Sequence, residues 1–434
     1  MAIDDSIDLE ARLERPGTAA GARQALRRAL EEAALERPRL IAGLMARFRD
    51  LEIAEDALHS AFEEALEQWP RRGLPERPAA WLATAAHRRA VDQLRRLGRW
   101  RAKQELLLHE SPQYEEPAAD ASRDLLDVVD DEVLCLLFTC CHPALAREAQ
   151  VALMLHTVCG LRTEEIARAF LLPRATLAQR LVRAKRKIRD AGIPFQVPPR
   201  SLLHERLDQV LLTVYLIFNE GHGSTSPGGA ELCREAHRLA GLLRELMPEE
   251  GEIEGLLALI ELCEARRAAR RDADGSYVEL ARQDRGLWDR AAIERACARV
   301  ESALRRGRVG PFQVQAAIQA VHAEAARWED TDWPQIVGLY EVLERMQPTP
   351  VVRLNRAVAL RYAGDPRASL ALLQEDEVRR ELDAYAPYHA ALAEALATLG
   401  RGHEAATSWR RAAGLTEEPA ARAWLEERAG VAQP

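Results

Sequence analysis

A proline set between two amphipathic segments places the strongest constraint on this chain. Residues 160–172 space apolar side chains for one buried helical face, and Thr163 is placed to cap that helix. Pro173 then ends it, because proline has no N–H to donate and biases the preceding residue away from helix. A second helix follows, with apolar residues recurring at three and four positions. Its expected buried stripe is Leu177, Leu181, Ala184 and Ile188. The stretch predicts a helix-turn-helix.

The outward face of this second helix is cationic and rich in hydrogen-bonding groups. It carries Thr176, Gln179, Arg180, Arg183 and Lys187, with Arg174 at the start of the helix. Residues 162–189 contain nine Lys or Arg and two acids. Such a face suits the major groove of DNA. The alternative is a basic helix pair whose charged face is only solvated.

Composition indicates an all-α protein of several domains. Alanine, leucine, arginine and glutamate dominate the 434 residues, and β-branched and aromatic residues are sparse. The length suggests about two to four domains. The net charge is −8, yet residues 85–103 hold seven Lys or Arg and one acid. Two basic stretches in an acidic chain allow DNA contact at two places.

Cysteine usage and hydropathy indicate a soluble protein of the cytoplasm. The seven cysteines fall mostly in apolar helical patterns, which fits free buried thiols in a reducing compartment. No signal peptide opens the chain, and no apolar run reaches the roughly 18 residues that a membrane span needs. We expect no membrane partner.

The first basic stretch follows an amphipathic helix that begins near residue 51. One flank of that helix is acidic, which by itself indicates a solvated face. The apolar stripe is Ala57, Leu58, Ala61, Phe62, Ala65 and Trp69, and the acidic flank is Asp56, Glu63, Glu64 and Glu67. Residues 71–78 read as a loop, and residues 79–100 as a further helix with its arginines outward. The acidic, proline-bearing residues 103–130 read as a linker between the two basic modules.

This ordered pair of modules resembles the extracytoplasmic-function group of bacterial sigma factors, in the sigma-70 family. The motifs are Asp56-Ala57 with Phe62, residues 81–96 (WLATAAHRRAVDQLRR), and residues 160–184 of the helix-turn-helix. The resemblance covers residues 20–195. It implies a first module that binds the clamp of core RNA polymerase and opens the −10 promoter element. The second module then reads the −35 element and contacts the polymerase flap.

The resemblance also assigns roles to individual residues. For the −35 element we expect contacts from Arg174, Thr176, Gln179, Arg180, Arg183 and Lys187. For the −10 element we expect Arg71, Arg72, Arg88, Arg89, Arg95, Arg96 and Arg99. Asp56 and Glu63 are expected to contact core polymerase. This chain has His87-Arg88 where the family often has Arg-Asn, which leaves base-specific use of position 88 open.

Two features near these motifs have competing interpretations. Trp81 can stack on an unpaired base, although a tryptophan in a helical stripe is more often core. Thiols and imidazoles gather before the helix-turn-helix, at Cys135, Cys140, Cys141, His142, His156 and Cys159. They invite a zinc interpretation. However, no C-x-x-C pair is present and leucines surround them, so we expect a buried core and no metal.

A long helical extension follows residue 200. Residues 207–218 are apolar on nearly every side and lead into a polar, glycine-rich loop at residues 219–229. The loop lacks the order of a phosphate-binding motif. Residues 215–221, together with residues 283–289, resemble the extension fused to one group of these sigma factors, and the resemblance implies that this extension controls activity. The resemblance makes Asn219, Glu220, Asp284, Arg285 and Trp288 candidate regulatory residues.

A catalytic interpretation of the extension has little support. His222 with Glu220 or Asp284 can be imagined as an acid and base pair. No nucleophile or cofactor motif accompanies them, so we expect no enzymatic activity, no catalytic residue and no cofactor.

The last part of the chain repeats. Residues 354–365 align with residues 390–401 at an offset of 36, which matches Ala357 to Ala393, Leu360 to Leu396 and Gly364 to Gly400. This resembles tetratricopeptide (TPR) repeats, which can bind a regulatory protein or peptide or serve only as structure.

The expected organisation follows from these parts. It is a sigma2-like domain at 20–102, a linker at 103–130, a sigma4-like domain at 131–195, a helical extension at 200–306 and TPR-like repeats at 307–430. The expected function is promoter recognition by a sigma factor bound to core RNA polymerase. The rival is a helical TPR-type scaffold or adaptor that binds peptide partners. The sequence leaves open whether the extension activates or restrains.

Overall fold

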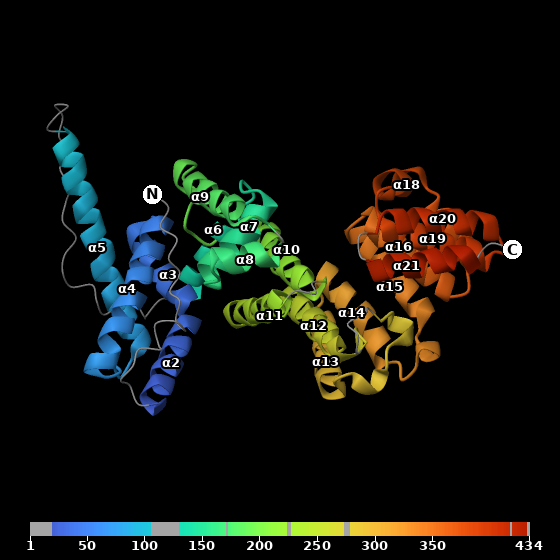
Figure 1. Ribbon diagram of the computed structural model, residues 1–434, viewed down its shortest axis with the longest axis horizontal. Coiled ribbons are helices and arrows are strands. Elements are labelled where there is room, and N and C mark those ends of the chain that lie inside the picture. The colour runs from blue at the N-terminus through green and yellow to red at the C-terminus, as the bar shows by residue number, and fades with distance from the viewer. Residues whose placement is uncertain are drawn as a thin grey trace. The chain divides into compact units, whose positions relative to one another are not determined.

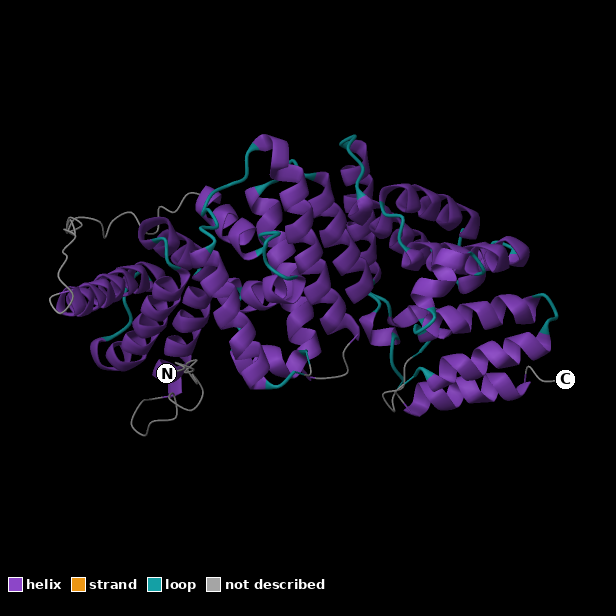
Figure 2. Ribbon diagram, turned by 90° about the horizontal axis from the view of Figure 1, so that it is seen from above, coloured by secondary structure: helices purple, strands orange, loops and turns teal. Residues whose placement is uncertain are grey.

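The computed structural model confirms the all-α class, since every regular element in the described residues is a helix (Figures 1 and 2). The described ranges are 20–105, 130–170, 172–223, 227–272, 278–416 and 419–431. The chain divides into two compact units, Met1–Leu239 (unit 1) and Ala240–Pro434 (unit 2).

Unit 1 opens with four amphipathic helices. They are α2 (Ala20–Leu35), α3 (Arg37–Phe48), α4 (Leu51–Arg72) and α5 (Pro78–Glu105). Asp50 caps α4, because its carboxylate accepts hydrogen bonds from the backbone N–H groups of Glu52 and Ile53 at 2.9 and 3.1 Å. The apolar stripe predicted for α4 is buried along its whole length. It packs against α3 and α5.

Two helix boundaries in this part differ from the prediction. Arg71 and Arg72 belong to the last turn of α4, so the loop is shorter than expected. The helix continues because Pro70 costs only one backbone hydrogen bond near a helix end. At the other side, α5 reaches Glu105 and takes in the first residues of the predicted linker. Linker residues 106–129 lie outside the described residues.

The helix-turn-helix forms as predicted, with a different cap. It comprises α8 (Thr163–Ala169) and α9 (Arg174–Asp190), preceded by α6 (Asp130–Cys140), α7 (Arg147–Leu153) and the π-helical turn η1 (Met154–Val158). Thr163 is the first residue of α8 and not its cap. The cap position is Arg162, whose backbone N–H donates to the Glu165 carboxylate at 2.7 Å. Ile166 and Ala167 are buried, and Phe170 is half-buried.

The first helix of the extension packs on this module. It is α10 (Arg200–Gly223), which lies against α6 and α7 and buries Leu207, Leu211 and Val214. Arg206 of α10 donates to the Phe138 carbonyl at 2.7 Å. The predicted loop at 219–229 is shorter, because α10 continues through Gly223 and α11 (Pro227–Leu246) starts at Pro227. Residues 224–226 lie outside the described residues.

Unit 2 is a series of short helices joined by turns. Its first part comprises the end of α11, α12 (Gly251–Glu264), α13 (Arg290–Arg305) and α14 (Pro311–Glu324), with the short 3₁₀ turns η2 (Arg267–Ala269), η3 (Leu280–Arg282) and η4 (Arg285–Leu287) between α12 and α13. After the 3₁₀ turn η5 (Trp328–Asp330) come α15 (Trp333–Met346), α16 (Pro350–Tyr362), α17 (Pro366–Leu373), α18 (Asp376–Leu382), α19 (Ala386–Thr398), α20 (Gly402–Gly414) and α21 (Pro419–Val431). Successive helices pack on one another, as in α15 with α16 and α19 with α20.

The repeat seen in the sequence has a structural counterpart. Ala357 of α16 and Ala393 of α19 are both fully buried, so each lets a neighbouring helix approach closely. Gly364 and Gly400 follow the ends of these helices and both take a positive φ, of 92° and 75°. A left-handed glycine is a common helix terminator, because other residues meet strain there. The two positions therefore end equivalent helices in the same way.

Replacing either terminal glycine by alanine should destabilise unit 2. A Cβ at Gly364 or Gly400 meets no atom within 4 Å, so the cost is backbone strain alone, about 1 kcal/mol. The matched control is Gly338→Ala, inside α15 and equally open, which should be neutral or stabilising by about 0.5–1 kcal/mol. Urea unfolding of the three variants measures the contrast. Equal effects at all three positions would contradict the assigned terminator role.

Candidate nucleic-acid interface

The outward face of α9 is solvent-exposed. Its predicted inward stripe is buried along its length, which turns the other residues outward. Thr176, Gln179, Arg183 and Lys187 are exposed, and Arg180 is half-buried. Arg174 forms a surface ion pair with Glu164 at 2.8 Å. Such pairs contribute only about 0–1 kcal/mol, so a phosphate can compete for Arg174. The predicted −35 residues therefore all lie on α9, and most of their side chains are exposed to solvent.

The arginines of α5 form a second cationic surface. Arg88, Arg89, Arg95 and Arg96 are exposed on one side of the helix. Arg89 makes two hydrogen bonds to Glu64 of α4, at 3.2 and 2.9 Å, and Arg88 lies 3.9 Å from the same carboxylate. Glu64 therefore neutralises part of this surface. Arg99 lies in α5, and its side chain is outside the described residues.

The neighbours of α5 clarify three sequence interpretations. Trp81 packs edge-on against Trp69 with ring centroids 5.5 Å apart, which favours the core interpretation over a stacking platform. His87 packs near Phe48, and burial lowers its pKa with help from the Arg47 charge. His87 is therefore neutral near pH 7. Arg71 and Arg72 are exposed at the end of α4.

The acidic flank of α4 holds the predicted polymerase contacts. Asp56 is half-buried and accepts a hydrogen bond from Gln93 of α5 at 3.2 Å. Burial raises the pKa of the Asp56 carboxyl. Glu63 lies two turns further along and is 3.8 Å from His59. Both carboxylates belong to the same side of one rigid helix.

The candidate regulatory residues serve different local roles. On α10, Asn219 is exposed and Glu220 is half-buried, where burial raises its pKa. In unit 2, Asp284 caps the turn η4 by accepting from the Gly286 N–H at 2.8 Å. Arg285 is 8% exposed and donates to the carbonyls of residues 322 and 325, at the end of α14. The Asp284 carboxylate therefore acts as a cap.

Trp288 is the centre of an arginine cluster. Its side chain is 3% exposed. The guanidinium carbons of Arg285, Arg290 and Arg266 lie 4.6, 5.6 and 5.7 Å from its ring centroid. Cation–π contact of this kind stabilises packing, and Arg290 also donates to the Ala323 carbonyl at 3.0 Å. The cluster fastens the irregular segment between α12 and α13 to the end of α14.

Three of the six thiols and imidazoles before α8 are buried, and the other three are half-buried. Cys135, Cys140 and Cys141 are buried thiols, and burial raises the pKa of Cys141 to about 12. Cys140 also has its pKa raised by burial, so both remain thiols at neutral pH. Among the described residues, these cysteines and histidines do not form a group that could hold a metal ion. No helix in the described part of the chain is long and apolar enough to cross a membrane.

Comparison with known proteins matches both cationic surfaces to one family. Residues 34–100 match Sigma-70 region 2, and residues 135–188 match Sigma-70 region 4. An uncharacterized protein of Rhizobium meliloti (strain 1021) is 43% identical over 399 residues, which cover 90% of this chain and 92% of that protein. The chain belongs to the sigma-70 family.

This sigma factor carries a C-terminal extension. Residues 206–304 match a family of unknown function, DUF6596. No solved structure matches the chain. Sigma-70 regions 2 and 4 imply promoter recognition together with core RNA polymerase, and proteins of this family are transcription factors rather than enzymes.

Regions 2 and 4 of this sigma factor meet at a buried carboxylate that sequence reasoning missed. Glu55 of α4 is 7% exposed and forms an ion pair with Lys185 of α9. It also accepts a hydrogen bond from the Thr157 hydroxyl at 2.5 Å, and His156 lies 4.0 Å away. Burial opposes ionisation, but these partners outweigh it and lower the pKa of Glu55 to about 2. A sequence signal existed, since Glu55 falls within the apolar spacing of Leu51, Leu58 and Phe62.

The same junction requires a glycine at the entrance to the helix-turn-helix. Arg37 of α3 donates to the Thr157 carbonyl at 3.1 Å. Gly160 has a φ of 76°, and a Cβ there would lie 2.7 Å from Cδ of Arg37. The Arg37 side chain therefore occupies the space that the Cβ of any other residue at position 160 would need.

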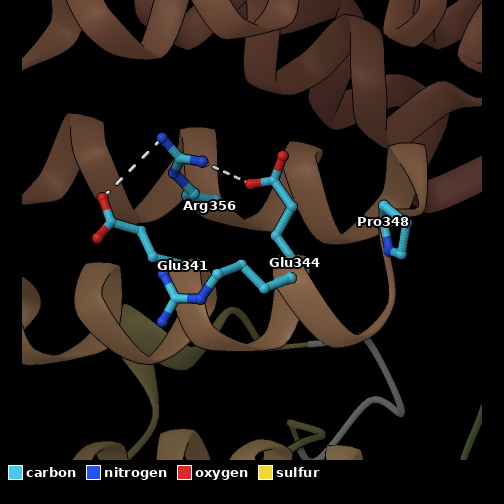
Figure 3. A pocket seen from close by; sticks show the side chains of 5 residues that line it. Glu341, Glu344, Pro348 and Arg356 are labelled. Carbon is cyan, nitrogen blue, oxygen red and sulfur yellow. Dashed lines mark hydrogen bonds and ion pairs between the residues drawn. The ribbon is translucent and has the colours of Figure 1, made fainter.

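A cavity in unit 2 was also not expected from the sequence. It has a volume of about 380 Å³ and is lined by Glu341, Glu344, Arg345, Pro348 and Arg356 (Figure 3). Arg356 bridges the two glutamates, at 4.0 Å from Glu341 and 2.5 Å from Glu344. Arg353 adds a second contact to Glu344 at 3.0 Å. The acidic groups are thus largely paired within α15 and α16.

Replacing Glu55 with glutamine should destabilise unit 1 by about 3 kcal/mol at pH 7, because the partly buried Lys185 loses its counter-charge. The folded pKa lies below the unfolded value of about 4.3, so the ion pair stabilises fully above that pH and its contribution disappears as pH falls toward 2. Urea unfolding from pH 7 to pH 3 should show the difference between wild type and variant shrinking. Glu67→Gln, exposed on the same helix, should change stability by less than about 0.5 kcal/mol. A pH-independent difference would contradict the assignment.

Proposed function

We propose that this sigma factor belongs to the extracytoplasmic-function group and directs core RNA polymerase to a two-element promoter. The observation that carries the proposal is the presence of two separate exposed cationic helices, α5 in region 2 and α9 in region 4. Each presents arginines at helical spacing while its opposite face is buried. We place its action in the cytoplasm, where promoter DNA and polymerase are found.

Helix α9 is proposed to read the −35 element from the major groove. Arg174 and Thr176 lie in its first turn, where recognition helices contact base edges. Gln179 and Arg183 follow on the same side, and their amide and guanidinium groups suit bidentate contacts to adenine and guanine. Arg180 and Lys187 are assigned to phosphates, which position the helix without reading sequence.

Arg183→Ala should weaken promoter binding by the holoenzyme. Loss of one phosphate or base contact should lower affinity about tenfold, and loss of a phosphate contact should reduce the salt slope by about 0.9. The control is Arg305→Ala, which removes an equal charge from an exposed site on α13. Filter binding between 50 and 200 mM salt measures both quantities. An unchanged affinity and an unchanged salt slope for Arg183→Ala would remove that residue from the interface.

Helix α5 is proposed to hold the −10 element. A cationic surface offsets the cost of exposing single-stranded bases, which is a few kcal/mol for each flipped base. Arg88, Arg89, Arg95, Arg96 and Arg99 supply this surface, and Arg71 and Arg72 flank the short loop before α5. Asp56 and Glu63 are proposed to contact the polymerase clamp.

The extension is proposed to control activity through TPR-like helices. The equivalent glycine terminators and buried alanines in α16 and α19 support a repeat, and the cavity between α15 and α16 offers a place for a regulatory peptide. We propose the domain limits 20–102, 131–195, 200–306 and 307–430, with residues 103–130 as linker. Asn219, Glu220, Asp284, Arg285 and Trp288 are proposed to transmit this control.

Truncation after residue 246 tests the role of the extension. The cut leaves α10 in place, because α10 buries apolar surface of region 4. If the extension restrains the factor, promoter-directed transcription by the truncated protein should rise severalfold; if it activates, transcription should fall by a similar factor. Circular dichroism melting establishes that the truncated chain is folded. Transcription equal to wild type would contradict any control by the extension.

A further inference from the structure

Polar groups without a hydrogen-bond partner gather at one place in unit 2. In the described residues, eleven buried side-chain nitrogen or oxygen atoms have no such partner. Five of the eleven lie in two segments, and they are Gln283 Oε1, Arg285 Nη2, Trp288 Nε1, His322 Nδ1 and Thr331 Oγ1. Arg285 joins the two segments, since it donates to the His322 carbonyl at 3.0 Å. Folded proteins leave few such groups, so this concentration calls for a physical reason.

Positive charge is concentrated at the same place. The guanidinium carbons of Arg266, Arg285 and Arg290 all lie within 5.7 Å of the centroid of the Trp288 ring. Arg266 and Arg285 are 7% and 8% exposed, and Arg290 is exposed. Within the described ranges, none of the three forms an ion pair with a carboxylate. Burial lowers the pKa of Arg285, and the charges of Arg290 and Arg266 lower it further.

Nearby acids compensate only part of this charge. Glu329 and Asp330 act on Arg285 from beyond ion-pair distance, and Asp330 is already paired with a neighbouring arginine. Asp284 and Asp289 flank the segment, but their carboxylates accept hydrogen bonds from backbone N–H groups as caps. A charge removed from water is costly unless opposite charge or hydrogen bonds replace the water. The cluster is therefore only partly compensated by this chain.

Capping of α14 accounts for part of the arrangement. Arg285 and Arg290 both donate through Nη1 to carbonyl oxygens at the end of that helix. A helix C-terminus carries roughly half a negative charge, which the three guanidinium groups exceed severalfold. Arg266 donates elsewhere, to the Leu262 carbonyl at 3.1 Å, and Nη2 of Arg285 stays without a partner. A structural cap thus explains where two of the arginines lie but not the charge excess.

A phosphate group fits these donors better than a carboxylate does. At neutral pH a phosphate monoester carries about −1.5 to −2 charges and presents three strong acceptor oxygens, whereas a carboxylate carries a single charge. Arginine donates two parallel N–H groups to a phosphate. Trp288 is 3% exposed and its ring is packed against guanidinium groups, so it offers an N–H and not a stacking surface. The arrangement suits the anion itself and not a nucleotide base.

We infer that Arg266, Arg285, Arg290 and the indole N–H of Trp288 form a binding site for the phosphate group of a small molecule. Arg290 is the exposed member, so a ligand reaches the buried donors by displacing this flexible side chain. Inorganic phosphate and phosphate monoesters share the required chemistry. The site lies wholly within unit 2, so it is independent of promoter recognition by regions 2 and 4.

Hydrogen exchange of the full wild-type chain tests the site. About 10 mM inorganic phosphate should slow exchange of the backbone amides of residues 283–290 at least fivefold, because a ligand that binds only the folded state stabilises it. Acetate and chloride at the same ionic strength are the controls and should leave these amides unchanged. Equal slowing by either control would overturn the inference. Slowing confined to α5 and α9 would also overturn it, because phosphate would then bind only the DNA faces.

A matched pair of variants tests the arginines. Arg290→Gln should weaken phosphate binding at least tenfold, because it removes a charge-assisted hydrogen bond to the anion. Arg305→Gln removes an equal charge from the exposed far end of α13 and should change the affinity less than twofold. Titration of the exchange at residues 283–290 gives the dissociation constant of this site alone. Equal affinities for the two variants would contradict the assignment.

The same titration with glycerol 3-phosphate identifies the source of the phosphate group. Tighter binding of glycerol 3-phosphate than of inorganic phosphate supports a monoester ligand, and the reverse order supports free phosphate. Binding of neither compound would overturn the inference. A chain that binds phosphate here but directs no transcription would refute the proposed function alone.

Discussion

The ionised carboxylate of Glu55 is the interaction on which unit 1 depends most. A buried charge is tolerated only when opposite charge and hydrogen bonds replace the water it loses. Lys185 and Thr157 supply both, and they come from two different elements of region 4. One side chain of region 2 thus contacts both η1 and α9. Together with the hydrogen bond from Arg37 to the Thr157 carbonyl, this carboxylate joins the helix-turn-helix module to region 2.

Small side chains make the remaining helix contacts possible. The buried face of α4 has alanine at four positions, including Ala54 and Ala57, and α5, which packs on α4, buries Ala85, Ala86 and Ala90. Alanine faces let helix backbones approach closely and leave the long arginine and glutamate side chains on the outside. The same device recurs in unit 2 at Ala357 and Ala393. A chain with few aromatic residues therefore still builds continuous cores.

Helix periodicity and proline position were enough to predict the fold class and the helix-turn-helix. The buried stripes of α4 and α9 were predicted residue by residue, because a period of 3.6 identifies one face. Helix ends were predicted less accurately, as at Gly223 and Thr163. Several side chains near the start of a helix can accept its free backbone N–H groups. Here the Glu165 carboxylate accepts the Arg162 N–H, whereas Thr163 was the predicted cap. The pairing of Glu55 with Lys185 was out of reach, because it joins residues 130 positions apart on different modules. Its only trace was an ionisable residue at an apolar position.

Helix α10 has a consequence for protein engineering. Its apolar side completes the core of region 4, and Arg206 ties it to the end of α6. A chimera that exchanges region 4 between relatives must therefore place its junction after Gly223, so that region 4 and α10 come from the same protein. A junction at the proline-containing segment 194–199 would separate α10 from the helices α6 and α7 on which it packs.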